Sequence, residues 1–157
     1  MKIITYESQI HFQKVLELHI LFLNELAKLR KDISKKVLLK NKEEEYLKEF
    51  LQTQNTDCFI IVEGEEVIGY SISYLCKTID PLHFVERKFA FIDEIFIHSS
   101  CRRQGYATEL IQHLKKHYKR NGIECMELYL LSNNFSAYKV YLNNNFSVQS
   151  MRMEIKL

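Results

Sequence analysis

The 157-residue sequence has one proline, four glycines and no tryptophan. So few glycines and prolines leave no room for a flexible linker between domains, and neither an internal repeat nor a low-complexity tract is present. A strong net charge is also missing, because 22 basic residues face 20 acidic ones and leave a formal charge of +2. Nucleic-acid-binding proteins usually carry a strongly basic face. We therefore expect one domain over residues 1–157, without a nucleic-acid partner.

The cysteine pattern argues against a metal site and against secretion. Cys58, Cys76, Cys101 and Cys125 form no C-x-x-C pair and have no histidine at ligand spacing, so we expect no metal. The N-terminus lacks the apolar stretch of a signal peptide, and no apolar run approaches the roughly 20 residues that span a bilayer. These absences favour a soluble, cytoplasmic protein in a reducing compartment, with no membrane partner.

The sequence does contain alternating strand-like and helix-like patterns. Apolar residues recur at helical spacing in 8–30, 42–52, 104–120 and 134–144. Strand-like runs occupy 3–6, 58–62, 68–74, 88–97, 124–131 and 146–156. The order predicts an α/β or α+β fold, in which a mixed sheet has helices on both faces. The run 124–131 is apolar on both faces, which is typical of a central strand.

The junction between the runs 88–97 and 104–120 carries the most informative pattern, Arg102 to Thr108. The first amides of a helix have no partner inside the helix, and the helix dipole places partial positive charge there. Gly105 has no side chain to block a ligand, and Arg102 and Arg103 offer donors suited to phosphate. The segment is typical of a pyrophosphate-binding turn, although an ordinary turn with solvated arginines fits it equally well.

In this setting the spacing of Arg102, Gly105 and Ala107, R-x-x-G-x-A, resembles a family signature. It is similar to the Q/R-x-x-G-x-G/A acyl-CoA motif of the GNAT superfamily of acetyl-CoA-dependent N-acyltransferases. The order of strands and helices resembles the same family over nearly the whole chain.

A second segment strengthens the resemblance. Asn134, Ala137, Tyr141 and Phe146 match the family pattern N-x-x-A-x-x-x-Y-x-x-x-G-F, with asparagine at position 145 where the family has glycine. Asparagine adopts a left-handed backbone more readily than most residues, so we expect the turn to be kept.

The resemblance implies a mostly antiparallel sheet in which two central strands, 88–97 and 124–131, splay apart around acetyl-CoA. The pantetheine arm would pair with the first of these strands as an extra strand does, and the pyrophosphate would rest on the amides of 103–108. The residues that the resemblance assigns to cofactor binding are Ile95, Phe96, Ile97, Arg102, Arg103, Gln104, Gly105, Tyr106, Ala107, Thr108, Asn134 and Tyr138.

Amine acylation needs a base for the incoming ammonium and a group that protonates or stabilises the leaving thiolate. The resemblance implies Tyr141 for the second role. Asp93 and Glu94 are the candidates for the base, because two carboxylates within an apolar strand are costly to bury without a partner or a task. Neighbours on a strand point to opposite faces, so we expect only one of the two to face the cleft, and the choice stays open. Glu127 is a weaker candidate.

Three other polar features have structural interpretations. The carboxylate that is not the base is expected to pair with Arg87, Arg102 or a lysine. His19 lies on an apolar helix face and is expected to be a hydrogen-bonded core histidine. The charged run 42–45 is typical of a solvated helix face.

We predict an N-acetyltransferase that moves an acetyl group from acetyl-CoA to a primary amine by direct attack in a ternary complex. The alternative is a non-catalytic acyl-CoA sensor, which the acidic pair and Tyr141 disfavour. A dinucleotide-binding protein is disfavoured because G-x-G-x-x-G is missing. Polyamines, amino acids, antibiotics and protein N-termini remain open as acceptors, and an exposed edge strand near the C-terminus leaves a homodimer open.

Overall fold

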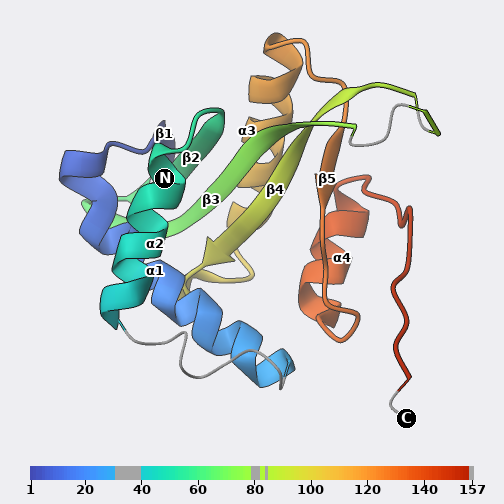
Figure 1. Ribbon diagram of the computed structural model, residues 1–157. Coiled ribbons are helices and arrows are strands. Elements are labelled where there is room, and N and C mark those ends of the chain that lie inside the picture. Colours follow the sequence, from blue (N-terminus) through green and yellow to red (C-terminus); the bar gives the residue numbers. More distant parts are fainter. Residues whose placement is uncertain (31–39, 79–81, 84, 156–157) are drawn as a thin grey trace.

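A computed structural model of the protein describes residues 1–30, 40–78, 82–83 and 85–155 (Figure 1). Five strands form one sheet in the order β1-β2-β3-β4-β5. Their bounds are Lys2–Thr5 for β1, Thr56–Glu63 for β2, Glu66–Lys77 for β3, Lys88–Ile97 for β4 and Met126–Leu128 for β5. The first four strands are antiparallel and β5 runs parallel to β4, so the sheet is mixed and mostly antiparallel, as predicted.

Helices cover both faces of this sheet, which confirms the predicted architecture (Figure 1). Two of them, α1 and α2, pack on one face, and α3 packs on the other. The bounds are Ser8–Leu29 for α1, Lys40–Gln52 for α2, Tyr106–Arg120 for α3 and Phe135–Asn143 for α4, with a short 3₁₀ helix, η2, at Ser99–Cys101.

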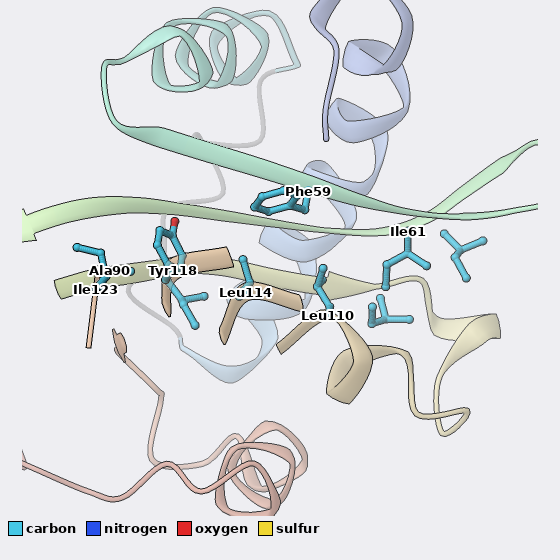
Figure 2. Packing of buried hydrophobic residues seen from close by; sticks show 10 residues of the cluster. Phe59, Ile61, Ala90, Leu110, Leu114, Tyr118 and Ile123 are labelled. Atoms are coloured by element: carbon cyan, nitrogen blue, oxygen red, sulfur yellow. The ribbon is translucent and has the colours of Figure 1, made fainter. Parts of the chain in front are cut away.

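Each face of the sheet has its own hydrophobic core, because alternate side chains of a strand point to opposite faces. The α3-face core, shown in Figure 2, contains Phe59, Ile61, Ile68, Ala90, Ile92, Ile97, Leu110, Leu114, Tyr118 and Ile123. The α1/α2-face core contains Val15, Leu16, Leu18, Leu47, Cys58, Ile60, Tyr70, Ile72 and Phe96. The sheet is therefore the middle layer of three.

A β-bulge in β4 reverses the alternation of its side chains. Ile72 of β3 pairs with Glu94, but the next residue, Ser73, pairs with Ile92, so Asp93 is an extra residue without a partner in β3. Ile92 belongs to the α3-face core, whereas Phe96 belongs to the α1/α2-face core. These two residues are four apart and would share a face in a regular strand. The bulge thus directs both Asp93 and Glu94 toward the side of α1 and α2.

The strands β4 and β5 pair over three residues and then separate. The register runs from Ala90 with Met126 to Ile92 with Leu128, and within the described residues no strand pairs with that side of β4 beyond Ile92. This separation is the predicted splay. The sequence run 124–131 was expected to be a central strand, but β5 is shorter and lies at the edge of the described sheet.

The predicted last strand, 146–156, is not formed in residues 146–155, and residue 156 lies outside the described part. Met151, Met153 and Ile155 alternate as in a strand, but each is more than four-fifths exposed. Alternation yields a strand only where a neighbouring strand supplies hydrogen bonds and a surface to cover. The described chain supplies neither to this segment.

The turns after α3 and α4 both have a left-handed backbone, which confirms the turn predicted at Asn145. Gly122 follows the last turn of α3 with φ of 73°, and Asn145 follows α4 with φ of 64°. The left-handed backbone of Asn145 explains how asparagine replaces the glycine expected there. None of the described helices is both long and apolar enough to cross a membrane.

Candidate functional site

The point where β4 and β5 separate is the centre of the candidate site. Asp93 is the first residue of β4 beyond the last pair of the two strands, and Tyr129 is the first residue after β5. The backbone of Ile95, Phe96 and Ile97 follows on β4 and pairs with β3 on one side only. An extended ligand could add to the other side as a further strand does.

The N-terminus of α3 lies just beyond the end of β4 and is not capped by a side chain. Its first helical hydrogen bond runs from the amide of Glu109 to the carbonyl of Gly105. The amides of Tyr106, Ala107 and Thr108 therefore precede the helical bonding pattern and are available as donors. Gly105 has φ of 86°, and a Cβ atom built there would meet nothing within 4 Å. Open space in front of free helical amides fits the pyrophosphate of acetyl-CoA.

The side chain of Arg102 is engaged within the protein. Its guanidinium donates to both carboxylate oxygens of Glu25, at 2.9 Å each, and to the carbonyl of Ile97 at 2.8 Å. It also lies 5.2 Å from the centre of the Phe96 ring. Arg102 thus ties the turn to α1 and to the end of β4, and Arg103 is the nearby arginine left to meet a phosphate.

Other predicted cofactor residues also use their side chains for internal contacts. The Tyr106 hydroxyl donates to Glu63 at 2.5 Å and to Gln104 at 3.2 Å. The Thr108 hydroxyl accepts a hydrogen bond from the Asn144 amide at 3.2 Å. These residues can therefore contribute to a phosphate site mainly through their backbone amides.

Helix α4 is held against α3 by Asn144, a residue that the sequence analysis did not single out. Asn144 is 1% exposed. Its side chain accepts from Gln112 at 2.9 Å, and its carbonyl accepts from Lys115 at 2.7 Å. At the other end of α4, the Asn134 side chain accepts from the amide of Ala137 at 3.2 Å and thereby caps the helix. This cap uses the side-chain oxygen of Asn134. Tyr138, one helical turn further along α4, is 39% exposed.

Tyr141 lies near the end of α4 and is half-buried. Its ring packs edge-on against Phe146 at 5.5 Å. Burial raises the pKa of Tyr141 to about 12, so its hydroxyl is protonated at neutral pH and can donate a proton.

Glu94 does not face solvent but takes part in a buried polar cluster, which we call the His19 cluster. It consists of His19, Glu43, Tyr70 and Glu94, each no more than 6% exposed. One oxygen of Glu94 accepts from the Tyr70 hydroxyl at 2.5 Å and lies 3.0 Å from Nδ1 of His19. Nε2 of His19 lies 3.4 Å from Glu43. The cluster joins α1, α2, β3 and β4 beneath the site.

The contacts of His19 favour its protonated form. Burial by itself lowers the pKa of His19, but the hydrogen bonds and charges of Glu94 and Glu43 outweigh it and raise the pKa. A protonated imidazole can donate from both ring nitrogens, one to each carboxylate. The pKa of Tyr70 is raised by burial and by the charge of Glu94, so this hydroxyl stays a donor.

Asp93 differs from Glu94 in its exposure to solvent and in its lack of a charged partner. Its side chain reaches solvent, and within the described residues no cation lies at ion-pair distance from it. Partial burial, followed by the charge of Glu94, raises the pKa of Asp93 to about 6, while the charge of His19 lowers it. A carboxyl group with this pKa exchanges protons readily near neutral pH.

The structure corrects three expectations about these carboxylates. Asp93 and Glu94 were expected on opposite faces, but the bulge places both on one face. Arg87, Arg102 or a lysine was expected to pair with whichever carboxylate is not the base. Glu94 instead pairs with His19, since Arg87 pairs with Glu127 and Arg102 with Glu25.

The third correction concerns Glu43, which the charged run 42–45 suggested to be solvated but which is buried against His19. His19 itself is confirmed as a hydrogen-bonded core histidine. A histidine on an apolar helix face signals that a buried partner exists, but sequence could not name the partner. Among the described residues, no group of three or more metal-binding side chains is placed to hold an ion.

Comparison with known proteins agrees with this geometry. The model of the acetyltransferase (GNAT) family matches residues 23–146, well over half of the chain. The chain belongs to the GNAT acetyltransferase family. This membership confirms the family that the two motifs predicted and makes the protein an acyltransferase by family. GNAT proteins generally use acetyl-CoA.

Solved structures with this GNAT fold include a tetramutant of the BH1408 protein from Bacillus halodurans, 21% identical over 100% of both chains, with a TM-score of 0.88. An aminoglycoside acetyltransferase from an uncultured soil metagenomic sample is 20% identical over 99% of this chain and 95% of that chain, with a TM-score of 0.72. A ribosomal-protein-alanine N-acetyltransferase from Brucella melitensis biovar Abortus 2308 is 16% identical over 100% of both chains, with a TM-score of 0.69. At these identities the similarity establishes the fold alone. No curated protein sequence matches this GNAT chain significantly.

Proposed function

We propose that this GNAT protein transfers an acetyl group from acetyl-CoA to a primary amine by direct attack in a ternary complex, with Asp93 as the base. The observation that carries the proposal is the bulge, because it leaves Asp93 accessible beside the separated strands with a pKa of about 6. Glu94 is the weaker candidate, since Tyr70 and His19 already occupy its carboxylate. Glu127 is weaker again, because it pairs with Arg87.

Cofactor binding would use the open backbone of Ile95 to Ile97 and the amides of residues 105–108. Gly105 supports this role, because the space in front of it is free for a pyrophosphate group. Arg103 would add positive charge, and Asn134 and Tyr138 at the start of α4 would meet the pantetheine or adenine part. When bound, acetyl-CoA supplies an acetyl thioester whose carbonyl carbon accepts the amine.

The residues of the chain can account for every proton in the reaction. Asp93 takes one proton from the substrate ammonium and passes it to solvent, which frees the nitrogen lone pair. The nitrogen bonds to the carbonyl carbon and the carbon–sulfur bond breaks. Tyr141, protonated because its pKa is about 12, gives its proton to the leaving thiolate. The second proton of the nitrogen restores Tyr141, so the products are the acetylated amine and CoA thiol.

The first test is isothermal titration with acetyl-CoA, with NADH as the control ligand, on the wild type and on Gly105→Glu. We expect the variant to lose at least about a hundredfold in affinity, because a carboxylate would occupy the position of the pyrophosphate. Wild type should bind acetyl-CoA and not NADH. Release of CoA thiol in the presence of amines then separates an enzyme from a sensor.

Gly122→Glu is the matched control for this variant. Gly122 also has a left-handed backbone, with φ of 73° and open space around it, but it lies at the opposite end of α3. The two variants therefore carry a similar backbone strain, on the order of 1 kcal/mol. If Gly105→Glu binds acetyl-CoA as tightly as Gly122→Glu does, the assignment of the α3 N-terminus is wrong.

A further inference from the structure

A row of five aromatic rings borders Asp93 on the α1/α2 side of the sheet. We call it the aromatic row, and it consists of Tyr46, Phe50, Tyr74, Phe91 and Tyr129. Successive ring centres lie 5.8, 5.9, 5.5 and 5.2 Å apart. The rings come from α2, β3, β4 and the residue after β5, so the row crosses the sheet where β4 and β5 separate.

The two ends of the aromatic row are open to solvent. Tyr46 is 53% exposed and Tyr129 is 89% exposed. The three rings between them are partly exposed. A contiguous exposed aromatic surface on a soluble protein commonly marks a binding site, and this one lies at the candidate site.

The aromatic row and the Asp93 carboxylate form one surface. Ile92 and Leu128 form the last pair of β4 and β5, and Phe91 and Tyr129 lie directly beside this pair in sequence. Asp93 follows Ile92 and is the first residue of the stretch of β4 that β5 leaves open. The pKa values of Tyr46 and Tyr74 are raised by burial first and then by the charge of Asp93. This carboxylate is therefore close to rings of both α2 and β3.

The charges around the aromatic row decide which ligand fits. The carboxylates whose charge reaches Tyr46 are Asp93, Glu94 and Glu43. His19 lies between the last two and offsets part of their charge. Of these three carboxylates, Asp93 is the exposed one, and no cation of the described residues lies at ion-pair distance from it, so it offers one site for one positive charge.

We propose that the acceptor is an arylalkyl monoamine, a primary amine with one ammonium group on an apolar, ring-bearing body. The inference rests on the proposed acetyltransferase function and names its substrate class. The ammonium would meet Asp93, and the body would stack on the aromatic row. The ring faces also attract the cation itself. Among the carboxylates whose charge reaches Tyr46, a polyamine would find no second unpaired one for its further charges, and a hydroxyl-rich amine would lose hydrogen bonds against these rings.

The test compares four amines as acceptors for wild-type protein with saturating acetyl-CoA, by release of CoA thiol. They are 2-phenylethylamine, ethylamine, spermidine and the aminoglycoside kanamycin. We expect kcat/KM for 2-phenylethylamine to exceed each of the others by about tenfold or more, the usual gain from one well-packed apolar group. Ethylamine is the matched control, because it has the same ammonium without the ring.

Variants of Tyr129 test whether the aromatic row provides the preference. In Tyr129→Leu we expect the ratio of kcat/KM for 2-phenylethylamine to that for ethylamine to fall about tenfold, with the affinity for acetyl-CoA unchanged. Tyr129→Phe keeps the ring and should keep the ratio. Ile10→Ala, at a 69% exposed position at the start of α1, should also keep it. The ratio is an internal measure that partial loss of folded protein does not alter.

Three outcomes would overturn the proposal in distinguishable ways. Equal or faster acetylation of ethylamine, spermidine or kanamycin would exclude the arylalkyl class and leave the acetyltransferase assignment intact. An unchanged ratio of kcat/KM for 2-phenylethylamine to that for ethylamine in Tyr129→Leu would exclude the aromatic row as the binding site and would also leave the acetyltransferase assignment intact. Acetylation of none of the four, despite acetyl-CoA binding, would overturn the acetyltransferase assignment and the substrate class together.

Discussion

The face of the sheet beneath α3 and the face beneath α1 and α2 bury different side chains. The α3-face core is apolar apart from Tyr118, whose hydroxyl donates to Asp57 at 3.0 Å and lies within hydrogen-bond distance of the Ser73 hydroxyl at 2.7 Å. The α1/α2-face core instead encloses the His19 cluster. Burying two carboxylates and a histidine costs folding free energy unless each is paired. This buried charge lies on the same face of the sheet as the accessible carboxylate Asp93.

The difference suggests a division of labour between the faces. An apolar core stabilises the fold with no dependence on pH, and in the proposed function α3 would present its N-terminus to acetyl-CoA from that support. The His19 cluster adds charge beneath Asp93, where Glu94 raises and His19 lowers the pKa of the exposed carboxyl group. One face thus supports α3 with an apolar core, and the other sets the electrostatic surroundings of the proposed base, Asp93.

The largest expected effects come from substituting the two neighbouring carboxylates, Asp93 and Glu94, and measuring kcat and the free energy of unfolding. Asp93→Asn should lower kcat by about 10²–10⁴-fold, because it removes the base, and should change the free energy of unfolding by less than about 0.5 kcal/mol. Glu94→Gln should do the reverse, with a clear loss of stability and a change in kcat below about tenfold. Steady-state kinetics and urea unfolding of both variants check the pair, and the opposite pattern would assign the base to Glu94.

On the α3 face, Leu114→Ala should lower the free energy of unfolding by about 2–5 kcal/mol, because Leu114 is fully buried and its loss leaves a cavity. The loss should be the same at every pH between 5.5 and 8.5. Urea unfolding across this range checks it. A loss that varied with pH would mean that the two faces are not independent.

Tyr141→Phe should lower kcat by roughly 10- to 100-fold, because a hydroxyl that protonates the thiolate acts in the transition state. The affinity for acetyl-CoA should stay nearly constant, since the ring and its contact with Phe146 remain. Kinetics and titration on the same preparation separate these effects. Equal turnover in variant and wild type would remove Tyr141 from the mechanism.

The smallest effect is expected in the pH dependence of stability. The pKa of folded His19 is raised above 6.5, so its contribution to stability is complete below pH 6.5 and is lost as the pH rises through the folded pKa. The slope for one proton is at most about 1.4 kcal/mol per pH unit. Asp93 acts mainly between pH 3.8 and about 6, so the slope measured by urea unfolding above that range reports mainly on His19.

His19→Gln should flatten this slope, while Leu114→Ala should keep it, which makes the apolar face the control for the charged one. A slope that persists in His19→Gln would show that another group titrates in this range. In that case the protonated state of His19 would no longer explain how Glu94 and Glu43 are buried together.

Sequence predicted most helices and strands because their signals are local. Helical spacing located α1 and α3 to within two residues at each end, and strand β4 was predicted with the bounds that it has. The larger errors in predicted strands lie in the C-terminal third. A strand was predicted over 124–131 but only Met126–Leu128 forms β5, and the alternating residues in 146–155 form no strand. A strand needs a neighbour, and the presence of a neighbour is not a local property.

The sequence by itself determined the family, the position of the helix N-terminus near Gly105 and the short list of carboxylates. These features depend on residue types at fixed spacing along the chain. Only the tertiary structure distinguishes the exposed Asp93 from the buried Glu94, because the bulge arises in the pairing of β4 with β3 and the contact of Glu94 with His19 joins residues 75 positions apart. The same holds for the aromatic row, whose rings come from four segments and meet only when the sheet forms. Packing between distant segments sets burial and charge, and these determine what each side chain can do.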